Sequence, residues 1–81
     1  MSSRLKFSDL RTGMRARVTN VGDLALAETR LMELGLTPGT EFTVVKVAPL
    51  GDPIEIDLRG FKLCLRRREA RGFELERLDV S

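Results

Sequence analysis

Histidine, tryptophan and tyrosine are absent from this 81-residue chain, which has a single cysteine, Cys64. Without histidine, the usual general base near neutral pH is missing, and the Cys64 thiol has no imidazole partner to activate it. One cysteine forms no intrachain disulfide and completes no recognisable zinc motif. We therefore predict no catalytic residues, no metal site and no cofactor, and we expect Cys64 to be a small packing residue in a reducing compartment.

Long apolar stretches are missing too. No run approaches the ~20 residues that a membrane-spanning helix needs, and the first residues are not followed by the apolar segment of a signal peptide. The sequence also contains no GxxxxGK[ST] motif, so a phosphate-binding loop is not expected. We therefore expect a cytoplasmic protein with no nucleotide-binding loop of its own.

The overall composition is that of an ordinary globular chain. Hydrophobic residues make up 42% and charged residues 32% of the sequence. A chain of this length has room for one small domain, which we assign to residues 1–81 with a core of about residues 5–78. The net charge is +2, and 11 of the 14 basic residues are arginine, which suits flat or bidentate contacts with a partner.

The first half of the chain predicts a strand, a helix and a second strand. Residues 14–21 alternate apolar and polar side chains, the period of a half-buried strand. Asp23 is a good N-cap for an amphipathic helix over residues 24–34, whose apolar stripe comprises Leu24, Ala27, Leu31 and Leu34. Residues 41–48 predict a central strand that is apolar on both faces, with Phe42 and Val44 opposite Val45 and Val47.

The second half predicts more short strands. Residues 54–58 and 61–65 alternate on either side of Arg59-Gly60, which indicates a hairpin with a two-residue turn and places Phe61 on its apolar face. Residues 66–71 favour one helical turn, and a last strand follows Gly72. Five short strands with one inserted helix predict a mainly β fold, a small closed barrel that leaves no exposed edge.

Two segments are punctuated by glycine and proline. Gly35 can end the helix in a left-handed conformation, which lets Leu36 fold back onto the preceding turn. Residues 37–40, with Pro38 and Gly39 in the middle, predict a type II turn, and residues 49–53 stop the following strand. We interpret these residues as turn-shaping, with Asp52 bonding its own turn backbone: Gly35, Pro38, Gly39, Pro49, Gly51, Asp52 and Pro53.

The segment LMELGLTPGTEF, followed by VVKVAPLGDPIEI, resembles the FeoA family of small cytosolic components of bacterial ferrous-iron uptake. Weaker similarity extends from about Leu5 to Leu78 and includes LRTGMRARV and LCLRRREARGFEL. The resemblance implies a single SH3-like barrel that works beside a large membrane permease carrying its own cytosolic GTPase domain. It also suggests possible binding of a transition-metal ion, for which the residues of this chain offer little support.

Three carboxylates lie close together in the sequence at Asp52, Glu55 and Asp57. Without histidine or cysteine support they would offer Fe²⁺ only weak contacts. We therefore predict that Glu55 and Asp57 form a solvated strand face.

Exposed apolar and basic residues are the remaining candidates for contact with a partner. Leu26 and Met32 lie away from the predicted apolar stripe, and Leu50 sits at the tip of a turn, where it either anchors a partner or folds onto the end of the barrel. The segment around Arg66, Arg67 and Arg68 is the densest basic stretch. Neighbouring glutamates and the shortage of aromatic residues favour ordinary solvation or a protein contact there over nucleic acid.

We therefore predict a non-enzymatic accessory protein that binds the GTPase-containing cytosolic part of the ferrous-iron permease and supports its assembly or activity. Its contact with the membrane would be indirect, through the permease. The alternative is a regulatory module, since the SH3-like domains of iron-dependent repressors resemble the same family, acting through a separate DNA-binding protein. The sequence leaves self-association open.

Overall fold

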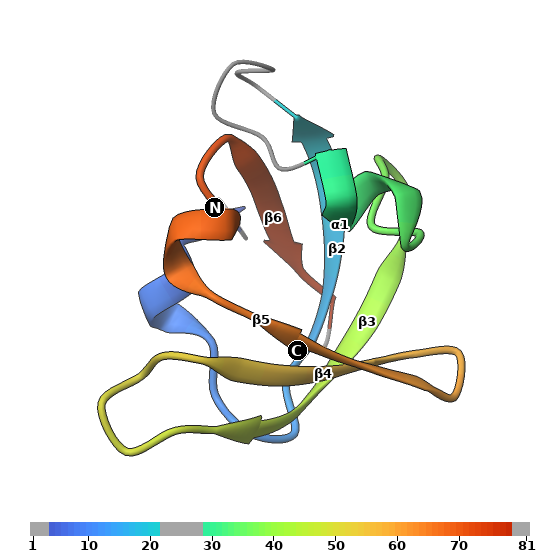
Figure 1. Cartoon of the computed structure of the whole chain (residues 1–81). Coiled ribbons are helices and arrows are strands. Elements are labelled where there is room, and N and C mark those ends of the chain that lie inside the picture. Colours follow the sequence, from blue (N-terminus) through green and yellow to red (C-terminus); the bar gives the residue numbers. More distant parts are fainter. Residues whose placement is uncertain (1–3, 22–28, 79–81) are drawn as a thin grey trace.

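Six antiparallel strands form one curled sheet in the computed structural model, which describes residues 4–21 and 29–78 (Figure 1). The strands run in the order β1-β6-β2-β3-β4-β5 across the sheet. None of the helices in this described part of the chain has the length and hydropathy to span a membrane. The elements are β1 (Arg4–Leu5), η1 (Phe7–Asp9), β2 (Arg15–Val21), α1 (Thr29–Glu33), β3 (Glu41–Val47), β4 (Ile54–Leu58), β5 (Phe61–Leu65), η2 (Arg67–Glu69) and β6 (Phe73–Arg77).

The predicted mainly β fold is confirmed, with one strand more than expected. The additional strand is β1, in which Leu5 pairs with Leu75 of β6. A two-residue strand is too short to show an alternating pattern, so the sequence gives no signal for it. Over the described residues, β1 and β5 end the hydrogen-bonded ladder. The sheet therefore curls around its core without the complete closure that we expected.

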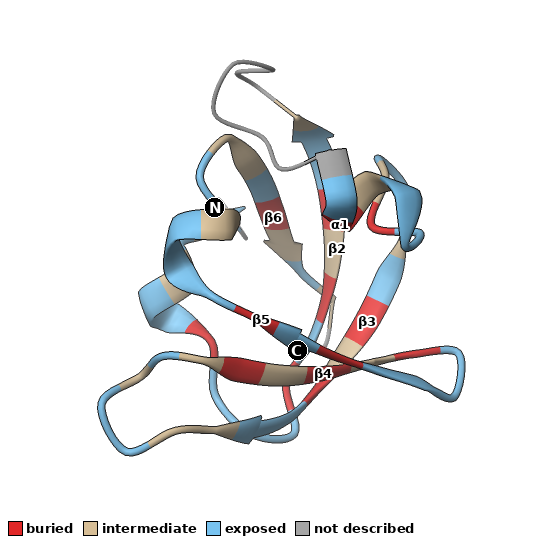
Figure 2. Ribbon diagram, viewed as in Figure 1, coloured by how far each residue is buried: buried red, intermediate tan, exposed pale blue. Residues whose placement is uncertain are grey.

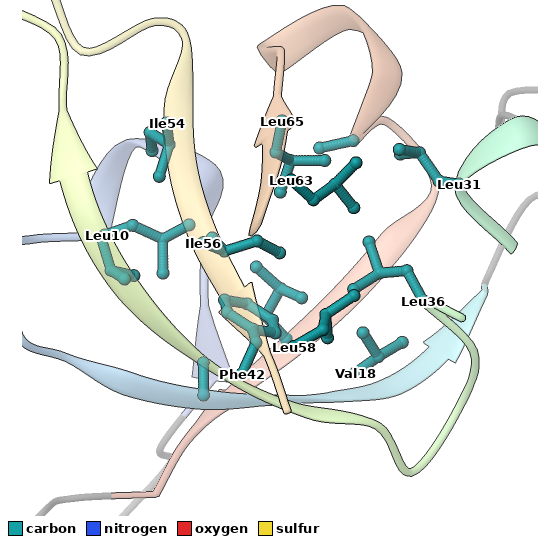
Figure 3. Close-up of a cluster of buried hydrophobic side chains, with 14 of the residues drawn as sticks. Leu10, Val18, Leu31, Leu36, Phe42, Ile54, Ile56, Leu58, Leu63 and Leu65 are labelled. Atoms are coloured by element: carbon teal, nitrogen blue, oxygen red, sulfur yellow. The ribbon is translucent and has the colours of Figure 1, made fainter. Parts of the chain in front are cut away.

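The core lies inside the curl of the sheet. Figure 3 shows side chains from β2, β3, β4 and β5 pointing toward one another, with Leu31 of α1 and Leu36 beside them. Burying such aliphatic side chains stabilises the fold by about 1.5–3 kcal/mol each. Fifteen residues form the buried cluster: Leu10, Met14, Ala16, Val18, Leu31, Leu36, Phe42, Val44, Ile54, Ile56, Leu58, Leu63, Leu65, Ala70 and Leu75.

Strand β3 is central, as predicted, but its second face is not buried. The register with β4 shifts between Val44 and Lys46, where a bulge accommodates one extra residue. Val47 is consequently returned to the core side opposite Ile54, while Val45 is left 36% exposed. The expectation that Val45 and Val47 share a face was wrong because a bulge changes the period of two.

Helix α1 covers only the end of the predicted helix. The predicted cap Asp23 and the stripe residues Leu24 and Ala27 lie outside the described residues. Leu31 is fully buried, whereas Leu34, predicted to be buried, is 36% exposed. Leu34 comes after the last helical residue, and the chain reverses before its side chain reaches the core.

The reversal after α1 is the predicted glycine-dependent cap. The Leu36 N–H donates to the Leu31 carbonyl at 2.9 Å, and the Gly35 N–H donates to the Met32 carbonyl at 3.1 Å. This pair of bonds is the Schellman motif, and Gly35 has the positive φ that it requires, +108°. The motif brings Leu36 back beside Leu31, and both are buried (Figure 3).

The predicted type II turn follows at once. The Thr40 N–H donates to the Thr37 carbonyl at 2.9 Å across Pro38 and Gly39. The turn also attaches to β2, because the Val18 N–H donates to the Thr40 carbonyl at 2.9 Å. The segment that leads from α1 into β3 is thus held to the sheet by its backbone.

The β4–β5 hairpin has the predicted two-residue turn at Arg59-Gly60, where both residues have positive φ. Two burial predictions made for β5 were wrong: Phe61 is 50% exposed, and Cys64 is exposed instead of packed. Leu63 and Leu65 occupy the buried face, so Cys64 falls on the opposite face. Phe61 pairs with Leu58 next to the Arg59-Gly60 turn, at the tip of the hairpin.

An ion pair joins α1 to η2. Arg30 and Glu69 lie 2.8 Å apart, and the other Glu69 oxygen accepts a hydrogen bond from the Arg66 N–H at 3.2 Å. The hydrogen bond from Arg30, assisted by that from Arg66, lowers the pKa of Glu69 below its ordinary value, against the opposing effect of burial. Only 14% of the Glu69 side chain is exposed. The contact therefore holds the predicted helical turn of residues 66–71 against α1.

Replacing Gly35 by alanine should destabilise the protein, because a side chain at this positive φ is strained. We expect the free energy of unfolding to fall by about 1–2 kcal/mol in a denaturant titration. Glu33→Ala, an exposed change in the same helix, is the control and should shift it by less than about 0.5 kcal/mol. Equal effects of the two substitutions would contradict the assigned cap.

The lowered pKa of Glu69 predicts a specific pH dependence. A depressed carboxyl pKa contributes stability above the unfolded-state pKa, and this contribution is lost as the pH falls through the folded-state pKa. Glu69→Gln should therefore lose less melting temperature than the wild type between about pH 7 and about pH 3. Thermal unfolding followed by circular dichroism measures this. Glu33→Gln serves as the control, and an unchanged profile for Glu69→Gln would refute the assignment.

Candidate docking surface

The turn between β3 and β4 presents Leu50 to solvent. The Gly51 N–H donates to the Ala48 carbonyl at 2.7 Å, and the Ala48 N–H donates to the Pro53 carbonyl at 3.1 Å. Both bonds fix the turn, and the Leu50 side chain at its tip is 92% exposed. Of the two alternatives open from the sequence, folding onto the end of the barrel is therefore excluded. Leu50 is an exposed apolar side chain on a backbone that is already ordered.

Asp52 connects this turn to η2. Its Oδ1 accepts a hydrogen bond from the Arg67 N–H at 3.0 Å. The sequence predicted that Asp52 would bond its own turn backbone, and this was wrong: its partner lies 15 residues further along the chain. Aspartate serves as a local turn former in many proteins, so composition alone does not distinguish the two uses. Asp52 thus joins the Leu50 turn to the arginine segment.

The arginine segment lies next to the Leu50 turn. Arg66, Arg67 and Arg68 are all exposed. A side-chain carbon at Gly51 would lie 4.0 Å from Nη2 of Arg67, so this guanidinium reaches the turn. The same guanidinium stands 5.9 Å from the centroid of the Phe7 ring, within the range of a cation–π contact. Figure 1 shows η2, η1 and the β3–β4 turn on one side of the molecule.

We name these residues the Leu50–arginine surface: Leu50, Asp52, Arg66, Arg67 and Arg68. It places the 92% exposed Leu50 side chain on a turn that the Arg67 guanidinium reaches, with the exposed Arg66 and Arg68 on either side of Arg67 in the sequence. Figure 2 shows this side as mostly exposed. In chemical terms the arrangement can anchor an apolar pocket and attract acidic groups around it.

The other two candidates for partner contact are not joined to this surface. Met32 is half-buried on α1, and the contact that connects α1 to η2 runs through Arg30 instead. Leu26 lies outside the described residues. The structure therefore brings Leu50 together with the arginines and leaves Met32 apart.

Two of the three carboxylates considered for a metal, Asp52 and Asp57, are engaged in other contacts. Asp57 accepts hydrogen bonds from Lys62 Nζ at 2.9 Å and from the Gly60 N–H at 2.6 Å, and these two bonds lower its pKa. Within residues 4–21 and 29–78, no cluster of three or more histidine, cysteine, aspartate or glutamate side chains could hold a metal ion. Asp57 instead supports the hairpin turn.

Sequence reasoning missed an apolar hollow of about 380 Å³ beside the tip of the β4–β5 hairpin. Leu34 and Phe61, both assigned to the core from their periodicity, are exposed and line it. The signal that both belong to the surface was their position at the ends of their elements. The full lining is Leu34, Gly35, Thr37, Thr40, Leu58, Arg59 and Phe61, which we call the Leu34–Phe61 hollow.

Similar solved structures share this fold. FeoA from Chlorobium tepidum is 45% identical, with a TM-score of 0.73 over 91% of this chain and 70% of that chain. FeoA from Stenotrophomonas maltophilia, described as a prokaryotic SH3 domain protein, is 29% identical, with a TM-score of 0.69 over 89% of each chain. The predicted SH3-like architecture is thereby confirmed.

A curated relative and a family model agree with these structures. The Fe(2+) transport protein A/Fe(2+) transporter FeoB fusion protein of Porphyromonas gingivalis is 33% identical over 72 residues, which cover 89% of this chain. The chain spans only 8% of that much longer relative. The model of the FeoA domain matches residues 5–77, which is nearly the whole sequence. The chain therefore belongs to the FeoA domain family.

Proposed function

We propose that this chain is a non-enzymatic cytosolic accessory protein that uses the Leu50–arginine surface to dock on the GTPase-containing cytosolic part of a ferrous-iron permease. It supports the assembly or activity of that permease by contact. Any GTP hydrolysis belongs to the partner. The observation that carries the proposal is the hydrogen bond from the Arg67 N–H to Asp52, which joins the turn carrying the exposed Leu50 to the arginine segment.

The family supports the choice of partner. FeoA domains are associated with ferrous-iron transport, and in the Porphyromonas gingivalis relative the FeoA region and the transporter FeoB belong to one polypeptide. Fusion keeps two domains at high effective concentration, so that even a weak contact between them is populated. A separate chain of this family needs a docking surface to achieve the same association.

The surface has the chemistry of a small interface. Moving the Leu50 side chain out of water contributes about 1.5–3 kcal/mol, and the ordered turn reduces the conformational entropy lost on binding. Exposed arginines at the rim speed the encounter with an acidic partner more than they add affinity. Leu50 would thus supply the anchor, and Arg66 and Arg68 the steering.

A protein partner fits this surface better than nucleic acid does. Phe7, the aromatic ring that Arg67 contacts, is half-buried and already covered by that guanidinium. Binding of single strands depends on exposed rings on which bases stack. Glu69, paired with Arg30, further reduces the positive charge of this segment.

Leu50→Ala should weaken binding to the purified cytosolic GTPase domain of the permease by about tenfold or more, because most of the anchor is removed. Titration calorimetry with and without a GTP analogue measures the dissociation constant. The matched control is Val45→Ala, which shortens an exposed apolar side chain on β3. An affinity that is unchanged by Leu50→Ala but reduced by Val45→Ala would place the interface on another face.

Arg68→Glu should slow association several-fold at low salt, and the difference from the wild type should shrink as salt increases. Stopped-flow or surface-based kinetics measure the association rate. Arg15→Glu is the matched control, since Arg15 is also exposed but lies on β2, outside both the Leu50–arginine surface and the Leu34–Phe61 hollow. Equal slowing by both variants would show that net charge, and not this surface, steers the encounter.

Absence of binding in every nucleotide state would contradict the proposed partner. That result would favour the alternative of a regulatory module that contacts a separate DNA-binding protein.

A further inference from the structure

The Leu34–Phe61 hollow lies between the turn that follows α1 and the tip of the β4–β5 hairpin. Exposed large hydrophobic side chains number four in the described part of the chain, and two of them, Leu34 and Phe61, meet in this hollow. Exposed apolar groups that gather in a depression mark an interaction site more often than scattered ones do. The hollow has room for one branched aliphatic side chain.

The polar residues at the rim of the hollow favour a ligand that carries a negative charge. The hydroxyls of Thr37 and Thr40 lie 3.1 Å apart, and Thr40 Oγ1 also donates to the Gly35 carbonyl at 2.8 Å, so both hydroxyls are engaged. Arg59 is exposed at the hairpin tip and forms no ion pair with any residue that the structure describes. The hollow is therefore suited to an aliphatic side chain accompanied by a carboxylate.

The β3–β4 turn of the same chain carries this combination. Leu50 is 92% exposed, and Asp52 follows two residues later with its carboxylate at the surface. Within the described residues, Asp52 accepts its hydrogen bond from the Arg67 N–H through Oδ1, which leaves Oδ2 to accept a further bond. The turn backbone is fixed by its own hydrogen bonds, which presents both side chains together.

The β3–β4 turn lies on the opposite side of the molecule from the β4–β5 turn, which borders the hollow, so the two do not meet within one copy (Figure 1). We propose that the Leu34–Phe61 hollow receives the Leu50 turn of a second copy of this chain. Leu50 inserts between Leu34 and Phe61, and Asp52 faces Arg59. The two surfaces differ, so the contact is head-to-tail and extends into short chains or closes into a ring.

The contact has a consequence for regulation, and this consequence rests on the proposed function. Leu50 serves both the permease and the second copy, so a copy seated in the hollow of another has its anchor covered. Self-association and docking would then compete for the same side chain. The head-to-tail contact itself does not depend on the permease and is tested with the chain alone.

Two variants that each disable one half of the contact provide the test. Leu50→Glu places a charge on the inserted side chain, and Phe61→Glu places one in the hollow. Sedimentation velocity should show the mass of the wild type rising with concentration, and each variant alone should raise the dissociation constant by at least about tenfold. Circular dichroism checks the fold, and Leu34→Glu is a second hollow variant on a different element.

An equimolar mixture of the two variants separates this geometry from a symmetric dimer. The intact turn of Phe61→Glu fits the intact hollow of Leu50→Glu, so the mixture should recover association and stop at a dimer. A wild type that stays monomeric at every concentration, or a mixture that stays monomeric, would overturn the proposal and leave the hollow to a different protein. Permease binding measured separately would be unaffected by that outcome.

Discussion

The backbone reversal after α1 is the constraint on which the rest of this fold depends. A single curled sheet buries the side chains on its inner face. These side chains would be exposed to solvent near the β2–β3 connection unless other residues packed over them. The bond from the Leu36 N–H to the Leu31 carbonyl brings two leucines into that position, and both are fully buried or nearly so (Figure 3). The type II turn that follows then attaches the chain to β2 through Val18.

A small number of contacts also organises the surface around Leu50. One carboxylate, Asp52, and one guanidinium, Arg67, connect the β3–β4 turn, η2 and η1, three segments far apart in the sequence. Each contact is weak by itself and exposed to solvent. Together they leave Leu50 uncovered beside the arginines, a cost in exposed apolar area that a purely structural turn would not require.

Most of the fold could be read from the sequence, because its elements depend on local patterns. Alternation located β2 and the β4–β5 hairpin, and glycine with proline located both turns. The predictions were wrong where pairing between strands distant in the sequence overrides the local pattern. The bulge that exposes Val45 depends on pairing with β4, and β1 exists only because β6 is beside it.

For the candidate surface, too, part was predicted from the sequence and part was not. That Leu50 is at a turn and that Arg66, Arg67 and Arg68 are solvated followed from the sequence, since turn chemistry and charge act over a few residues. Only the tertiary structure shows that Leu50 is exposed and that its turn is joined to the arginine segment, because the bond from the Arg67 N–H to Asp52 spans 15 residues. Leu34 and Phe61 had the periodicity of core residues, and the packed structure leaves them at the surface because Leu34 follows the last helical residue and Phe61 begins its strand next to the hairpin turn.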